Sequence, residues 1–283
     1  MEKQKKIKRC ASDRVLITIF YILVAIFAIV CLYPLLLAIG TSFADEASVT
    51  VNGYRVIPKK FSLSAYQMIL GSMGKNLLNA YTVTIGVTVF GTLLSVLISA
   101  AFAYVLTVRE FKPKGALNMF LYIPMIFSAG LLPWYIMCTK YYHLTDSFLA
   151  LVLPCCMNAF NVFLLRNFFK SIPEELAEAA KIDGATNRQL LRHVTIPMVM
   201  PSITICTFLT LTNSFKLFDQ NLALTAGEPA NSSELLALNI FNTFYGRNGW
   251  EGVGQAKAVI FFIIVGVIAL IQNKLTTSKE VQQ

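Results

Sequence analysis

Charged side chains are scarce in this sequence. Of its 283 residues only 14% are Asp, Glu, Lys or Arg, whereas 56% are hydrophobic, and the mean hydropathy is +0.62. A soluble domain of this length needs far more charge to cover its surface. The composition therefore excludes a soluble globular protein and predicts an integral membrane protein.

The residue patterns that carry most enzymatic chemistry are also missing. The sequence has two histidines but no nucleophile beside a base, no pair of carboxylates at an active-site spacing and no glycine-rich phosphate loop. Its six cysteines include no CxxC pair, and their placement does not resemble a disulfide framework. We interpret them as small buried apolar residues. We therefore expect no catalytic residue, no cofactor and no bound metal ion.

Six apolar runs are candidates for crossing a bilayer, which takes about 20 residues. They are residues 15–41, 81–106, 117–138, 148–169, 195–217 and 258–272. Proline and asparagine interrupt the third and fourth runs, and such breaks are tolerated where neighbouring helices satisfy the backbone. These breaks can mark a path through a helix bundle, or they can be ordinary kinks. The sequence predicts an all-α integral membrane protein with six transmembrane helices.

The distribution of lysine and arginine indicates the orientation. With the N-terminus inside, most of the 24 basic residues fall on the cytoplasmic side, as the positive-inside rule requires. We predict a basic cytoplasmic N-terminus (1–14), a transmembrane domain (15–275) and a cytoplasmic tail (276–283). A basic N-terminus can also attract nucleic acid or anionic lipid, but beside a first span it is typical of a topology signal. The net charge of +9 therefore requires no nucleic-acid partner.

A polar segment, residues 171–196, lies between the fourth and fifth runs, on the predicted cytoplasmic side. Ser171 and Glu174 have the spacing of a capping box, with Pro173 in the first turn, and they predict the start of a helix. Gly184 predicts the end of this helix, because glycine readily adopts the left-handed conformation that closes a helix.

A second short helix follows almost at once. Thr186 and Gln189 form another capping box, and the helix should run toward Pro197. Helices this short need packing to stay folded, so we expect the pair to lie against another structure rather than act as a plain connector. The carboxylates should face the cytosol, while the apolar side chains should face the membrane bundle. These apolar residues are Leu176, Ala179, Ala180, Leu190, Leu191 and Val194.

The stretch "EAAKIDGATNRQLLRHVTIPMVMP" resembles the signature cytoplasmic loop of permease subunits in bacterial binding-protein-dependent ABC importers. The neighbouring "FFKSIPEELAEAAKIDGA" is similar to the carbohydrate-uptake branch, which includes maltose and oligosaccharide importers, and the resemblance covers most of the chain. The matching residues are Glu178, Ala179, Ala180, Asp183, Gly184, Ala185, Ile196, Pro197 and Pro201.

This resemblance implies the fold of a type I importer permease in the bacterial inner membrane. The polar segment would be a pair of coupling helices that seats in a cleft of a separate nucleotide-binding ATPase. Glu178 would make a charged contact there, Gly184 would form the turn, and Ala179 and Ala180 would allow close packing. The implied partners are ATPase subunits, a second permease subunit, an extracellular sugar-binding protein and the lipid bilayer.

The two ends of the chain resemble different members of a permease pair. The first outer loop, "VNGYRVIPKKFSLSAYQMIL", resembles the permease that stands second in maltose-like pairs. After Pro201, "LTNSFKLFDQNLALTAGEPANSSELLALNIFNTFY" resembles its partner type. The sequence therefore leaves open which half of a heterodimer this chain forms. Permeases for amino acids, phosphonate or metals share the loop without the carbohydrate-like flanks, and a secondary transporter or a scaffold would need no ATPase.

Hydroxyl and amide side chains alternate with aromatic ones on the fifth run. A neutral sugar needs hydrogen-bond partners for its hydroxyl groups and a flat apolar surface for its C–H face. Hydroxyl side chains are equally typical of helix interfaces in membranes, so packing remains an alternative. The candidates for the substrate path are Thr210, Asn213, Phe215 and Phe218.

The segment after the fifth run, residues 218–257, should face the external binding protein. Lys216 and Asp219 are three residues apart at its start, a spacing that allows an ion pair on one helical face. Because they lie near the outer end of the run, snorkelling of the lysine to the lipid headgroups is the simpler explanation.

Overall fold

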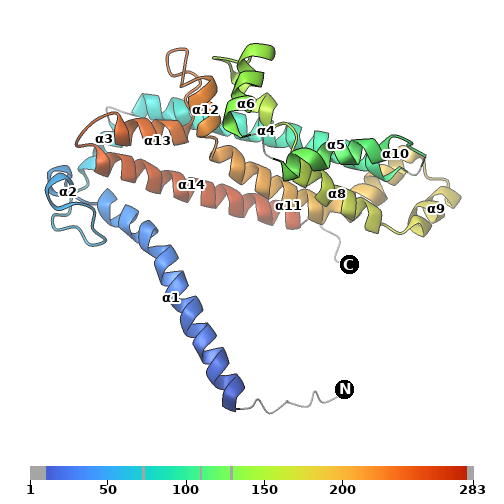
Figure 1. The fold of residues 1–283 in the computed structure, drawn as a ribbon, viewed down its shortest axis with the longest axis horizontal. Coiled ribbons are helices and arrows are strands. Elements are labelled where there is room, and N and C mark those ends of the chain that lie inside the picture. Colours follow the sequence, from blue (N-terminus) through green and yellow to red (C-terminus); the bar gives the residue numbers. More distant parts are fainter. Residues whose placement is uncertain (1–10, 72–73, 109, 128–129, 279–283) are drawn as a thin grey trace.

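The computed structural model describes residues 11–71, 74–108, 110–127 and 130–278, and this part of the chain is almost entirely helical (Figure 1). Two π-helical turns, η1 and η3, and a 3₁₀ turn, η2, interrupt the α-helices. The elements are α1 (Ala11–Ser42), α2 (Glu46–Asn52), α3 (Ser64–Leu70), α4 (Gly74–Thr107), α5 (Lys114–Ile126), α6 (Leu131–Ile136), η1 (Met137–Tyr141), α7 (Phe148–Val152), η2 (Leu153–Cys155), α8 (Ala159–Ser171), α9 (Glu174–Ile182), α10 (Asn187–Leu190), η3 (Leu191–Thr195), α11 (Ile196–Phe215), α12 (Asp219–Leu224), α13 (Leu236–Tyr245) and α14 (Glu251–Thr277).

Helices α4, α8, α11 and α14 form an elongated bundle in which α11 contacts the other three. Figure 1 shows α2 and α3 at one end of the bundle and α9 and α10 at the other. The first outer loop and the polar helix pair of the sequence therefore lie at opposite ends of the molecule. This arrangement agrees with loops on opposite sides of a membrane.

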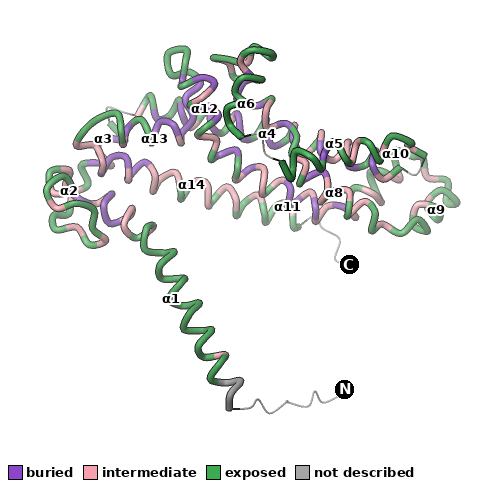
Figure 2. The backbone as a smooth tube through the Cα atoms, in the orientation of Figure 1, coloured by how far each residue is buried: buried purple, intermediate pink, exposed green. Residues whose placement is uncertain are grey.

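Helix α1 leaves the bundle at the α2 end and projects away from it (Figure 1). Only its last residues are buried, among them Thr41 and Ser42. At this junction a Cβ atom on Gly40 would collide with the carbonyl oxygens of Arg55 and Val56, so the close approach requires glycine. Nearly all of the remaining apolar surface of α1 is exposed (Figure 2), and we infer that lipid or another protein covers it.

Helix α4 connects the two larger buried clusters of the bundle. One cluster joins it to α3, α13 and α14, and the other joins it to α5, α8 and α11. Small side chains let helices approach closely in a membrane, and the buried face of α4 is rich in them. This face includes Thr84, Thr88, Gly91, Thr92, Ser95, Ser99 and Ala103.

Within the described residues, four helices are long and apolar enough to cross a membrane: Val15–Ser42, Gly74–Thr107, Asn187–Phe215 and Glu251–Thr277. A fifth crossing is possible if the pair Phe148–Cys155 and Ala159–Ser171, bent by 45°, forms one broken span. The bend confirms the interruption predicted for the fourth run. The predicted count of six spans is not confirmed.

The third predicted span, residues 117–138, is divided between α5, α6 and η1 in the structure. Pro124 lies inside α5, and Gly130, with φ +81°, directly precedes α6. The 13 residues of α5 extend only about 20 Å at 1.5 Å per residue, whereas the bilayer core is about 30 Å thick. The apolar composition of this run therefore did not guarantee one continuous helix.

Parts of both predicted cytoplasmic ends, residues 1–10 and 279–283, lie outside the described residues, as does Cys10. The other five cysteines are free thiols, and Cys138, Cys156 and Cys206 are buried as predicted. Cys31 is an exception because it is exposed on α1. The cytoplasmic placement of the two ends remains a prediction.

The predicted outer loop, residues 218–257, contains α12 and α13, and a buried polar network joins α13 to α14. The Lys257 side chain is only 1% exposed. Its Nζ donates to Asn239 Oδ1 at 2.8 Å and to Thr243 Oγ1 at 2.7 Å. The Glu234 carboxylate accepts from Asn239 Nδ2 at 2.8 Å and from Asn242 Nδ2 at 2.9 Å. Asn239 therefore connects a buried cation to a buried carboxylate.

A second polar contact joins α2 to the start of α14. Glu46 Oε1 accepts a hydrogen bond from the backbone N–H of Gly252 at 2.9 Å. Burial raises the pKa of the Glu46 carboxyl, and the neighbouring Glu251 raises it further, whereas the hydrogen bond from Gly252 lowers it. The net effect is a raised pKa, so Glu46 binds its proton more tightly in the folded protein.

Candidate functional sites

The first helix of the polar segment, α9, is present as predicted, but the predicted capping box at Ser171 is wrong and the helix begins later, at Glu174. Ser171 is the last residue of α8, and its hydroxyl donates to the Phe168 carbonyl oxygen at 2.8 Å. Pro173 is the N-cap residue of α9 and lies just before the first turn. Because a residue before proline avoids the helical conformation, Ile172 is extended and α8 has to end there.

The turn and the second capping box are confirmed. Gly184 has φ +80°, the left-handed conformation that favours glycine. The backbone N–H of Thr186 donates to Gln189 Oε1 at 2.9 Å, and the N–H of Gln189 donates to Thr186 Oγ1 at 3.4 Å. The two residues therefore satisfy each other's backbone groups at the start of α10.

Helix α10 does not end before the fifth span but continues into it. Through the π-helical turn η3 it joins α11, and together they form the 29-residue span Asn187–Phe215. Pro197 lies in the first turn of α11 and has no N–H for the carbonyl of His193, which an α-helix would pair with it. The wider turn of η3 lies directly before this proline, and the helix passes it without a break.

The predicted packing of the helix pair against the bundle is wrong. Leu176 is 43% exposed, Leu191 is 42% exposed and Ile182 is 86% exposed, and no residue that the structure describes in α9, α10 or η3 is buried. The extended Ile172 directs α9 past the end of the bundle (Figure 2). Its apolar side chains therefore face outward, where they are open to another protein.

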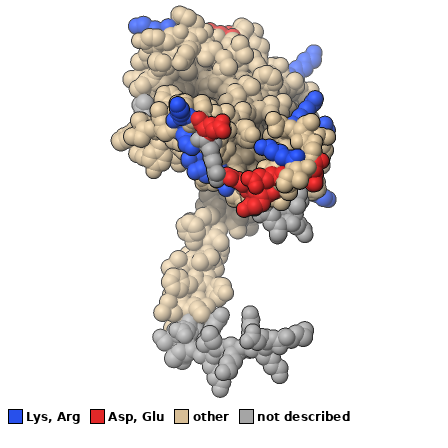
Figure 3. Space-filling model, turned by 90° about the vertical axis from the view of Figure 1, so that its right-hand side faces the viewer, with Lys and Arg blue, Asp and Glu red and all other residues tan. Residues whose placement is uncertain are grey.

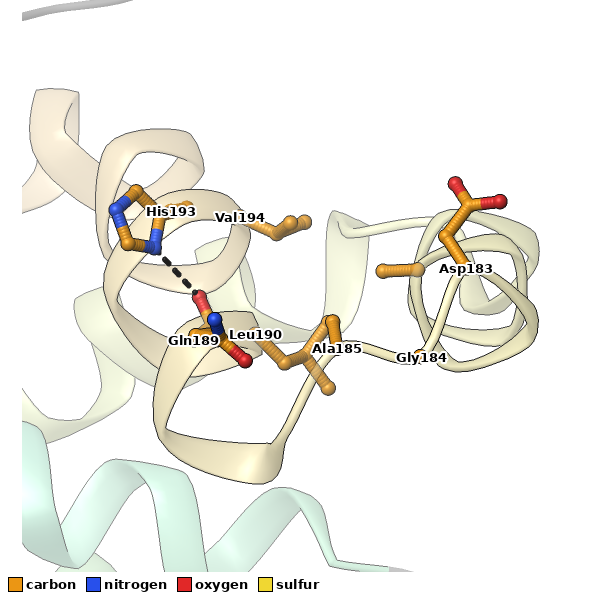
Figure 4. Close-up of a pocket in the computed structure, with 8 residues that line it drawn as sticks. Asp183, Gly184, Ala185, Gln189, Leu190, His193 and Val194 are labelled. Carbon is orange, nitrogen blue, oxygen red and sulfur yellow. Dashed lines mark hydrogen bonds between the residues drawn. The ribbon is translucent and has the colours of Figure 1, made fainter.

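Charges of both signs gather at this end of the molecule (Figure 3). An open hollow of about 340 Å³ lies between the end of α9 and the start of the long helix (Figure 4). His193 lies on its wall, with Nδ1 3.1 Å from the Gln189 carbonyl oxygen. The hollow is lined by Ala180, Asp183, Gly184, Ala185, Gln189, Leu190, His193 and Val194.

The structure brings four of the predicted coupling residues together in this hollow, namely Ala180, Asp183, Gly184 and Ala185. Glu178 and Ala179 are on α9 and exposed, outside the lining, and Pro197 is further along, in the first turn of α11. Their role in contacting an ATPase remains a prediction. Gln189 and His193 were not predicted as site residues.

A larger cavity, of about 510 Å³, lies between α4, the bend before α8, and α11. Of the four predicted substrate-path residues, only Thr210 and Asn213 line it. The lining consists of Ser95, Pro154, Cys155, Met157, Asn158, Phe160, Asn161, Leu209, Thr210, Asn213, Ser214 and Leu217.

Phe215 and Phe218 do not line this cavity. The Phe215 ring packs against Phe261 with its centroid 6.2 Å away, and the Phe218 ring packs against Phe241 at 4.9 Å. Helical periodicity explains the difference, since Phe215 follows Thr210 by five residues and is rotated from it by about 140°. These rings support helix packing in this structure.

Three amides in the cavity lining, from Asn158, Asn161 and Asn213, flank its hydroxyl groups. Asn161 Nδ2 donates to Thr210 Oγ1 at 2.9 Å, which links α8 to α11. Asn158 caps α8 by accepting from the Phe160 N–H at 2.9 Å. Sequence reasoning missed Asn158 and Asn161, although the polar residues that interrupt the fourth apolar run were a signal for them.

Lys216 and Asp219 do not form the ion pair that their spacing allowed. Helix α11 ends at Phe215 and α12 begins at Asp219, so the two residues do not share a helical face. Lys216 is exposed at the end of α11, and this placement agrees with the simpler explanation of a lysine that reaches the headgroups.

Residues 114–278 match the family model described as "Binding-protein-dependent transport system inner membrane component". The "Probable starch degradation products transport system permease protein AmyD" of Thermoanaerobacterium thermosulfurigenes is 50% identical over 115 residues, which are 41% of this chain and 39% of that protein. The "Polygalacturonan/rhamnogalacturonan transport system permease protein YtcP" of Bacillus subtilis (strain 168) is 36% identical over 204 residues, which are 71% of this chain and 70% of that protein.

The fold is similar to a solved bacterial ABC transporter "involved in the import of the acidic polysaccharide alginate". The TM-score is 0.78 at 26% identity, and the similarity covers 94% of this chain and 97% of that chain. The family match includes the polar helix pair and three of the four bundle helices, α8, α11 and α14. By this match and by its fold, the chain belongs to the family of inner membrane components of binding-protein-dependent transport systems, and it is a multi-pass membrane protein.

Proposed function

We propose that this chain is the transmembrane permease subunit of an ATP-driven saccharide importer. It forms half of the translocation path and hydrolyses no ATP itself, since the energy comes from a separate nucleotide-binding subunit. The observation that carries the proposal is the single helix from Asn187 to Phe215. This helix has one end at the outward-facing helix pair and its other end at the solute-sized cavity.

The exposed helix pair is suited to engage an ATPase. Leu176 and Ile182 are apolar and face outward, and the carboxylates Glu175 and Glu178 lie on the same short helix. Such a patch, apolar with charged neighbours, is typical of a protein interface. Because α10 continues into α11, movement of the helix pair displaces Thr210, which is about 30 Å along the same helix.

The exposed surface of α1 supports a second permease subunit as a partner. Most of its apolar side chains are exposed, since α1 contacts the bundle helix α14 near its last turns and then projects away from the bundle (Figure 1). A neighbouring subunit could cover part of this surface while lipid covers the rest. We place the external binding protein on the side of the molecule that carries α2, α3 and the 225–234 loop, away from the α9 and α10 helix pair.

The names of the relatives support a saccharide as the solute, because starch degradation products and polygalacturonan appear in them. The amide and hydroxyl groups of the cavity are consistent with hydrogen bonding to such a solute. Uptake of labelled oligosaccharides, compared with amino acids, phosphonate and metal ions, distinguishes this proposal from other solute classes.

Co-purification tests the coupling. Glu178→Lys and Gly184→Pro should lower the amount of nucleotide-binding subunit that is recovered with this chain by about tenfold, or uncouple ATP hydrolysis from uptake, because each alters the proposed contact or its turn. Glu110→Lys is the matched control, since it makes the same charge change at another exposed glutamate, and it should have no such effect. Uptake that persists after deletion of the ATPase would contradict the proposal.

A further inference from the structure

We propose that this chain's part of the path admits neutral saccharides and disfavours those that carry carboxylates. The inference rests on the proposed function and concerns the same cavity. It separates two solute chemistries that both occur among the relatives, starch degradation products on one side and the acidic polysaccharide alginate on the other.

The polar groups of the cavity match the hydroxyl groups of a sugar. Asn161 uses its Nδ2 for Thr210, which leaves its Oδ1 as an acceptor. Asn213 is exposed in the lining, and its side chain makes no hydrogen bond with any residue that the structure describes. An amide offers both donors and an acceptor, and a sugar hydroxyl can use either.

Ser95 brings α4 into the wall of the cavity. Its side chain is 0% exposed and its Oγ has no hydrogen-bond partner in the described part of the chain, yet the residue lines the cavity. Because this hydroxyl is fully buried, the groups that a solute can reach are the amides of Asn158, Asn161 and Asn213. On another part of the lining, the exposed ring of Phe160 offers a flat surface to a C–H face.

The residues that line the cavity are all uncharged. The nearest basic residue on α8, Arg166, follows Asn161 by five positions and is therefore about 140° around the helix. Lys216, at the end of α11, is exposed and is not part of the lining. Moving a carboxylate from water into such a cavity carries a desolvation cost that none of the described lining residues offsets with a positive charge, whereas a neutral polyol exchanges one set of hydrogen bonds for another.

Cysteine modification in the complete importer tests this selectivity directly. The six native cysteines are replaced by alanine or serine, and Asn213→Cys places one thiol in the cavity. Its reaction rates with a neutral and an anionic methanethiosulfonate are compared with those of Ser232→Cys, a thiol at an exposed position of the 225–234 loop. The anionic reagent should be slowed about tenfold more at position 213 than at position 232, because it meets the same desolvation cost as an acidic sugar. Thr210→Cys repeats the measurement one turn away if Asn213→Cys fails to assemble.

Saccharide protection completes the test. A glucose trisaccharide should slow modification at position 213, while a galacturonate trisaccharide at the same concentration should not. Equal protection by both sugars, or an anionic reagent as fast at 213 as at 232, overturns the inference and leaves the proposed function intact. If neither sugar protects or is taken up while an amino acid or another solute is, the proposed function fails and this inference fails with it.

Discussion

The buried Lys257 network predicts a large loss of stability when its cation is removed. Lys257→Met keeps the length of the side chain but removes two hydrogen bonds, to Asn239 Oδ1 and to Thr243 Oγ1. Hydrogen bonds from a charged donor contribute about 1.5–3 kcal/mol each. Methionine avoids the desolvation of an ammonium group, which offsets part of this loss. We expect a net destabilisation of about 2–4 kcal/mol.

The size of the destabilisation depends on which polar groups lose their hydrogen-bond partner when Lys257 is replaced. Thr243 still donates to the Asn239 carbonyl oxygen at 2.8 Å, so its hydroxyl stays satisfied. Asn239 Oδ1 loses its hydrogen-bond donor. The buried Glu234 carboxylate, which Asn239 joins to Lys257 through hydrogen bonds, loses the nearby positive charge. Adding Glu234→Gln should therefore recover part of the stability, because an amide needs no compensating cation.

The measurement is the temperature at which half of the detergent-purified protein is lost from the monodisperse peak after a fixed heating time, since unfolding of such proteins is usually irreversible. Lys257→Met should lower this temperature by about 5–10 °C. Lys216→Met, which changes an exposed lysine, should lower it by no more than about 1 °C. Equal effects of the two substitutions, or no recovery with Glu234→Gln, would refute the reasoning.

Three further outcomes are expected. Gly40→Ala should lower the stability of the protein by about 1–3 kcal/mol and weaken the packing of the end of α1, because the new Cβ meets the Arg55 and Val56 carbonyl oxygens. Proteolysis between α1 and α4 should therefore be faster than in a Gly115→Ala control, whose Cβ meets no other atom. Gly184→Ala should cost about 1–2 kcal/mol through its φ of +80° alone, since its Cβ also meets nothing, and the ATP hydrolysed per solute transported should rise. Because the raised pKa of Glu46 means that the folded protein holds this proton more tightly, stability should increase as pH falls from neutral toward 4.5; Glu46→Gln should flatten that part of a melting-temperature profile, and an unchanged slope would contradict the assignment.

Features that depend on neighbouring residues could be predicted from the sequence. The Thr186 capping box and the left-handed Gly184 follow local rules, and the structure has both. Ser171 shows the limit of such rules, since it fits the same capping pattern but ends α8 instead. Pro173 decided the outcome there through its effect on the preceding residue.

Features that depend on distant residues could not be predicted in this way. Glu234 and Lys257 look like an unrelated loop carboxylate and a loop lysine in the sequence, and only the return of α14 along α13 brings them into one network. The cavity likewise combines α4, α8 and α11. By contrast, helical periodicity alone places Phe215 and Thr210 on different faces of α11, so the sequence already contained the information that only one of them could line the cavity.

The small buried face of α4 also bears on how easily the bundle changes shape. Helices that interlock through large side chains must lift apart before one can slide along the other. Thr88, Thr92 and Ser95 give α4 a nearly smooth surface against its neighbours, so a shear displacement there meets few steric barriers. For a transporter that changes between two shapes, such a surface should lower the barrier to that change, and bulkier residues on this face should slow transport even if the protein became more stable.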